Sequence, residues 1–64
     1  MERTDISTLL DELQRKLDAE KNPYKVRDLK GEYGVQLCYL RQADTTLAQS
    51  YISWMQEFNQ RMLK

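Results

Sequence analysis

Apolar residues recur at helical spacing in the last third of the chain, from Asp44 to Lys64. At about 100° per residue, they form a central stripe with a tryptophan on one flank. The stripe and its flanks comprise Leu47, Tyr51, Ile52, Trp54, Met55, Phe58, Met62 and Leu63. This pattern predicts one amphipathic helix over residues 44–64, with an apolar face that covers roughly half of its circumference. Thr46 with Gln49 has the form of a capping box, and Asp44 and Thr45 are alternative N-caps.

A narrower apolar stripe predicts a first helix over residues 5–21. Its residues have coiled-coil-like spacing, which suits packing against one neighbouring helix: Ile6, Leu9, Leu10, Leu13 and Leu17. Asn22-Pro23 should end this helix, because a proline disfavours helical backbone at the residue before it.

The middle segment, residues 24–41, fits two structures. In the first, residues 24–29 and 32–41 are antiparallel strands joined by a tight turn at Lys30-Gly31. Apolar residues then alternate with polar ones and share one face of the hairpin: Tyr24, Val26, Tyr33, Val35, Leu37 and Tyr39. This alternation favours an α+β fold, a single αββα domain over residues 1–64 in which two helices cover a β-hairpin.

Some residues do not fit the hairpin. Leu29, Cys38 and Leu40 would lie on its outer face, and Gly34 would interrupt a strand. The alternative is an all-α fold of three to four helices. It is supported by apolar residues that recur at spacings of three and four: Val26, Leu29, Tyr33, Leu37 and Leu40.

In the helical alternative, residues 29–40 resemble a helix-turn-helix DNA-binding motif, with Gly34-Val35 as its turn. The chain departs from that pattern at Lys30, where a small residue normally lets the two helices approach, and at Gly31, which follows inside the first helix. The resemblance implies a DNA-binding transcriptional regulator. The recognition helix would then present Gln36, Tyr39 and Arg41 to the bases. The phosphates would be bound by Lys25, Arg27 and Lys30.

Length and composition predict that the chain needs outside stabilisation. A domain of 64 residues buries a small core, and Cys38 is the single cysteine in a chain with no histidine. A disulfide within the chain is therefore excluded, and a structural zinc site is not expected. Oligomerisation, most simply as a homodimer, is the remaining common remedy. The chain also lacks a long apolar run and an apolar N-terminal leader, which predicts a cytoplasmic protein outside the membrane.

Charge and catalytic residue types favour a binding protein. Ten basic and ten acidic residues cancel, which disfavours strong electrostatic binding to nucleic acid. The absence of histidine removes Ser-His and Cys-His nucleophile pairs, and the two glycines are too few for a phosphate-binding loop. We therefore expect no enzyme activity, no cofactor and no metal.

The wide apolar face of the last helix is the main functional clue. Its predicted interface residues are Leu47, Tyr51, Ile52, Trp54, Met55, Phe58 and Met62, and Trp54 and Tyr51 are the expected anchors. The sequence thus predicts a small non-enzymatic regulator or inhibitor that binds another protein and itself. Phages and mobile elements use compact proteins of this kind. A small structural subunit of a larger assembly is a further alternative.

Overall fold

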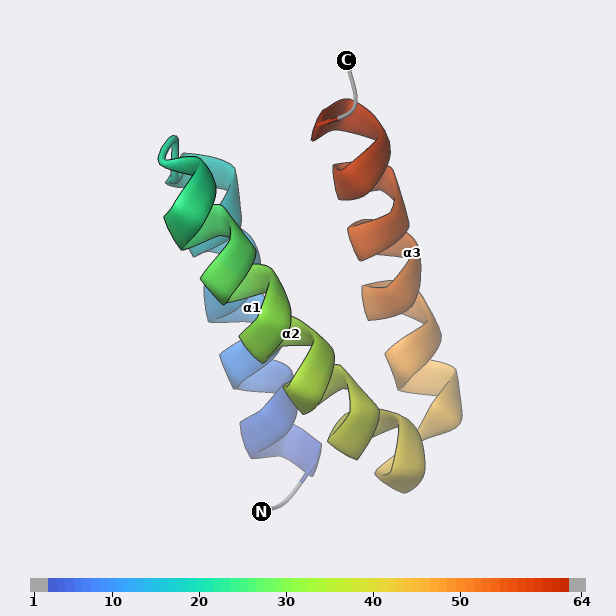
Figure 1. The fold of residues 1–64 in the computed structure, drawn as a ribbon. Helices are drawn as coiled ribbons and strands as arrows, with labels where there is room; N and C mark the ends of the chain where they lie inside the picture. The colour runs from blue at the N-terminus through green and yellow to red at the C-terminus, as the bar shows by residue number, and fades with distance from the viewer. Residues whose placement is uncertain (1–2, 63–64) are drawn as a thin grey trace.

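The computed structural model describes residues 3–62 and contains three α-helices joined by short turns (Figure 1). α1 spans Arg3–Ala19, α2 spans Pro23–Ala43 and α3 spans Thr45–Met62. α1 and α2 lie side by side and antiparallel, and α3 returns along α2, so the start of α1 and the end of α3 lie at opposite ends of the bundle (Figure 1). The first and last helices confirm the sequence prediction to within two residues, apart from residues 63–64, which lie outside the described residues.

The predicted α+β fold is wrong. Residues 3–62 contain no strand, and the whole of the proposed hairpin lies within α2. The helix buries Leu40 completely, together with Val26 and Tyr33, whereas the hairpin would have left Leu40 on its outer face. Val35 and Tyr39, which completed the strand-like alternation, are instead exposed on α2. The apolar stripe that supported the helical alternative is the one that packs into the core.

The helix-turn-helix prediction is also wrong. α2 continues through Gly34-Val35 without interruption, and no described residue has the positive φ that a left-handed turn there would use. A single helix of 21 residues therefore replaces the predicted pair.

The first turn is held by the side chains of Glu20 and Asn22. The Glu20 carboxylate accepts hydrogen bonds from the backbone N–H groups of Lys21 and Asn22, at 3.2 and 3.1 Å. Asn22 is the N-cap of α2, because its side-chain oxygen accepts from the Tyr24 N–H at 2.9 Å, and Pro23 occupies the first helical position. The predicted break therefore also starts the next helix.

The second turn consists of one residue, Asp44. Its backbone N–H donates to the carbonyl of Leu40 at 2.7 Å and closes α2. Its carboxylate accepts from the Leu47 N–H at 3.0 Å and caps α3, so Asp44, one of the alternative caps, fills this role. Thr45 adds a hydrogen bond from its hydroxyl to the carbonyl of Arg41.

The core runs along the line where the three helices meet. Its buried residues come from all three: Ile6, Leu10, Leu13, Leu17, Val26, Tyr33, Leu40, Ala48, Tyr51 and Phe58. α1 supplies four of its five predicted stripe residues, and Leu9 is half-buried. The α2 contribution recurs every seven residues, as expected for a helix that packs along its length against two neighbours.

Both glycines lie in the middle of α2 on its exposed side. A Cβ atom built at Gly31 or at Gly34 would meet nothing within 4 Å. Glycine in an exposed helix interior is less stable than alanine by about 1 kcal/mol. Packing within this chain therefore gives no reason for either glycine.

Candidate functional site

The structure buries part of the interface predicted on α3. Tyr51 and Phe58 are core residues, and Leu47, Trp54 and Met55 are partly buried against that core. Ile52 is half-buried, while Met62 keeps 55% of its surface exposed. Much of the wide apolar face is therefore covered by α1 and α2, and Trp54 and Met62 are the largest members still in reach of a partner.

Two tyrosine hydroxyls fix α3 against the other helices. The Tyr33 hydroxyl of α2 donates to the backbone carbonyl of Tyr51 at 2.9 Å and accepts from the Gln14 side-chain amide at 3.0 Å. The Tyr51 hydroxyl donates to the Asp11 carboxylate at 2.9 Å and lies 3.1 Å from the Ser7 hydroxyl. These bonds join all three helices at the level of Tyr51 and satisfy the polar groups that the tyrosines carry into the core.

Burial keeps both tyrosines protonated. The loss of solvent around the Tyr33 ring raises the pKa of its hydroxyl from 10.0 to about 12, against the opposing effect of the Gln14 hydrogen bond. Burial also raises the pKa of Tyr51, and Asp11 adds to this because a phenolate beside a carboxylate is disfavoured. The two hydroxyls therefore remain hydrogen-bond donors at any physiological pH.

An aromatic row leads from this hydrogen-bonded level to the C-terminal end of α3. The Trp54 ring lies 5.6 Å from Tyr33 and stacks on Phe58 at 5.3 Å, with 16° between the Trp54 and Phe58 planes. The Arg61 guanidinium lies 5.6 Å from the Phe58 ring centre. Trp54 is therefore held in place before any partner arrives, while one part of it stays open to solvent.

The open part of Trp54 faces a groove between α1 and α3. This groove has a volume of about 500 Å³ and is lined by Asp18, Trp54, Glu57, Gln60 and Arg61, which we call the Trp54 groove. Arg61 and Asp18 form an ion pair across it at 3.3 Å, and both side chains are more than half exposed. Trp54 is the apolar residue of this lining, and charged and polar side chains surround it, as a polar rim surrounds the apolar centre of a protein-binding site.

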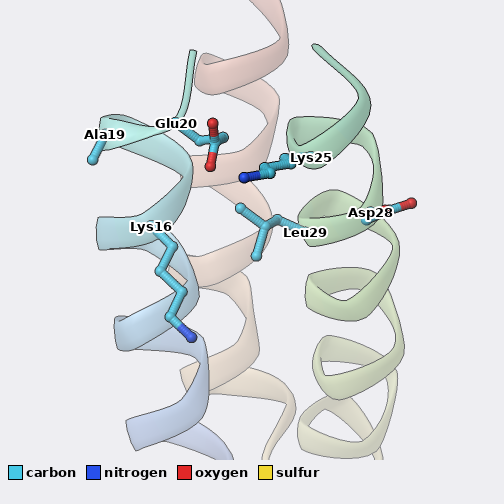
Figure 2. Close-up of a pocket in the computed structure, with 6 residues that line it drawn as sticks. All are labelled: Lys16, Ala19, Glu20, Lys25, Asp28 and Leu29. Atoms are coloured by element: carbon cyan, nitrogen blue, oxygen red, sulfur yellow. The ribbon is translucent and has the colours of Figure 1, made fainter. Parts of the chain in front are cut away.

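A second groove lies between α1 and α2 near their shared turn (Figure 2). It is lined by Lys16, Ala19, Glu20, Lys25, Asp28 and Leu29. Figure 2 shows the Lys25 ammonium group directed toward Glu20, with Leu29 between the helices and Asp28 pointing away. The charges of this groove balance, and the Glu20 carboxylate already binds the turn, so its chemistry selects no particular ligand.

The residues proposed to bind DNA do not form one surface. At helical spacing, Lys25 and Tyr39 lie on one flank of α2, and Arg27 and Arg41 lie on the other. Lys30 and Gln36 are half-buried, and the side-chain oxygen of Gln36 is buried without a hydrogen-bond partner. With no second helix after a turn, these residues do not meet in a single basic face.

Sequence reasoning missed the exposed side of α2. Val35 and Tyr39 keep 53% and 55% of their surface exposed, and Cys38 is exposed beside them. The signal was present, because a helical α2 with its buried stripe on one side must carry these residues on the other. The preference for a hairpin hid it.

Within residues 3–62, no three His, Cys, Asp or Glu side chains are grouped so that they could hold a metal ion. Over the same residues, none of the helices is both long and apolar enough to cross a membrane. Comparison of the chain with protein-family models, curated proteins and solved structures gives no match.

Proposed function

We propose that this chain is a non-enzymatic regulator of the cytoplasm that works as a homo-oligomer and binds another protein at the Trp54 groove. The observation that carries the proposal is the half-buried Trp54, stacked on Phe58 at the edge of the core. A tryptophan that is already ordered loses little conformational freedom on binding, and tryptophans are strongly enriched among the residues that dominate interface energetics.

The lining of the groove defines the partner's chemistry. Its floor offers the Trp54 ring to an apolar side chain, and its rim offers the acids Asp18 and Glu57 beside Arg61. The partner segment that fits best presents one large apolar side chain next to a basic residue, because Glu57 makes no ion pair within the described part of the chain. Binding of that segment would expel water from the exposed part of Trp54.

Affinity capture from cells that produce the protein tests this proposal. Glu57→Arg reverses the charge at the rim, and Gln49→Arg adds a positive charge to another exposed side of α3, about two turns before Glu57 and outside the groove lining. We expect the Gln49→Arg variant to retain its protein partner and the Glu57→Arg variant to bind it at least about tenfold more weakly. Trp54 is the single tryptophan, so its emission should shift to shorter wavelength when the purified partner is added. Equal capture by the two variants, with unchanged emission, would contradict the proposal.

A further inference from the structure

We infer that a second copy of this chain packs its own α2 in parallel against the outer face of α2. Between Gly31 and Gln42, the outer face consists of six exposed, uncharged residues: Gly31, Gly34, Val35, Cys38, Tyr39 and Gln42. The exposed Asp28 precedes them on the same side of α2. This inference rests on the self-association part of the proposed function and names the surface that carries it. It does not depend on the Trp54 groove, which lies between α1 and α3.

The outer face has the residue spacing of a coiled-coil seam. Gly31, Val35, Cys38 and Gln42 follow one another at intervals of four, three and four residues, as the a and d positions of a heptad do. The buried stripe of α2 lies on the opposite side of the helix and is already covered by α1 and α3. α2 therefore carries two packing faces, of which this chain alone occupies one.

Charges beside the seam select a parallel pair. Arg27 and Glu32 flank the seam on opposite sides and are five residues apart, the separation at which opposite flanks meet in a parallel coiled coil. Arg27 of each copy would then face Glu32 of the other copy, so the symmetric dimer would contain this ion pair twice. Both residues are exposed, and neither has an ion pair among the described residues. An antiparallel pair would instead bring Arg27 toward Arg41 of the second copy.

The same register gives a reason for Gly34. Tyr39 stands five residues after Gly34, on the same two flanks as Glu32 and Arg27, so Tyr39 of one copy would face Gly34 of the other. The space beyond Gly34, where a Cβ would meet nothing within 4 Å, leaves room for the tyrosine ring to lie across the helix backbone. Tyr39, now 55% exposed, would bury much of its ring there.

Sedimentation equilibrium of the full chain under reducing conditions tests the inference. Val35→Lys places a charge on the outer face, and Met62→Lys places the same charge on α3 at a residue of nearly equal exposure, 53% against 55%. We expect the original chain to dimerise, Val35→Lys to raise the dimer Kd at least about tenfold and Met62→Lys to leave it unchanged. Circular dichroism checks that each variant keeps its helices.

Charge reversal at low salt tests the orientation. We expect Arg27→Glu alone to raise the Kd and the double variant Arg27→Glu with Glu32→Arg to restore it. A Kd that falls for Arg27→Glu would indicate an antiparallel pair and overturn the inference. A dimer weakened by Met62→Lys and not by Val35→Lys would show that the outer face of α2 is not the dimer surface, although the chain still self-associates. A chain that stays monomeric to millimolar concentration would overturn self-association as well, and neither result changes the capture test of the Trp54 groove.

Discussion

The two sides of α2 carry the same residue types with opposite burial. On the inner side, Val26 and Tyr33 are 5% and 0% exposed, and on the outer side Val35 and Tyr39 are 53% and 55% exposed. Residue type therefore does not decide which side of this helix forms the core. The decision comes from α1 and α3, whose apolar stripes both meet α2 along the line of Val26, Tyr33 and Leu40.

The two tyrosines show what the inner side requires in addition to apolar surface. Tyr33 is buried with its hydroxyl bound to Gln14 and to the Tyr51 carbonyl, so the hydrogen-bonding capacity of this hydroxyl is satisfied. Tyr39 is exposed, so its hydroxyl can form hydrogen bonds with water instead. A tyrosine can thus occupy either side, but only the inner one depends on partners from two other helices.

The largest expected difference between the sides comes from shortening their valines. Val26→Ala should lower the free energy of unfolding by about 2 kcal/mol, because it removes buried methyl groups and leaves a cavity. Val35→Ala, the same change at an exposed position, should alter it by less than about 0.5 kcal/mol in dilute solution. Urea unfolding followed by circular dichroism measures both. Equal losses for the two variants would mean that the outer side is also packed within one chain.

The tyrosine hydroxyls give the second largest expected difference between the two sides of α2. Tyr33→Phe should destabilise the chain by about 1 kcal/mol at neutral pH, because Gln14 loses its acceptor and Tyr51 loses a donor to its carbonyl. Tyr39→Phe is the matched control and should leave stability unchanged. Thermal unfolding of both variants at one protein concentration makes the measurement.

Alkaline pH gives a second test of the Tyr33 hydroxyl. The pKa of Tyr33 is raised from 10.0 to about 12 in the folded chain, so the folded state holds this proton more tightly than the unfolded state. The resulting stabilisation is complete below pH 10 and is lost as the pH rises from 10 to about 12. We expect Tyr33→Phe to lose less stability over this interval than the original chain, which urea unfolding at a series of alkaline pH values would measure.

The smallest effect is expected at the glycines of the outer side. Gly34→Ala should raise the free energy of unfolding by about 0.5–1 kcal/mol in dilute solution, because alanine favours helix and its methyl group meets open space. The same substitution should weaken self-association, since the methyl group would occupy the place of Tyr39 from a second copy. A variant that is more stable as a monomer but dimerises less would separate the two roles. Loss of monomer stability would mean that Gly34 has a contact within the chain.

The sequence was sufficient for the parts of the fold that depend on local patterns. α1 and α3 followed from stripes at helical spacing, and Asn22-Pro23 marked the break between α1 and α2. α2 could not be assigned in this way, because Tyr33, Val35, Leu37 and Tyr39 alternate as in a strand while Tyr33, Leu37 and Leu40 recur as in a helix. Two apolar faces on one helix produce both periods at once.

The candidate site was predictable in outline only. The apolar width of α3 was visible in the sequence, but its division between core and surface depends on where α1 and α2 lie against it. Tyr51 thus became a buried residue bound to Asp11, whereas Trp54 stayed at the edge of the groove. The partners that satisfy Tyr33 and Tyr51 come from 18 to 44 residues away in the chain, which no local pattern reports.

The single-residue connection at Asp44 has a consequence for how the bundle opens. The same residue closes α2 through its backbone and caps α3 through its carboxylate, and Thr45 binds back to α2. Fraying at the start of α3 therefore removes bonds from the end of α2 in the same event. Amide protons on both sides of Asp44 should exchange with solvent as one cooperative unit, so this corner joins two helices into a single folding element.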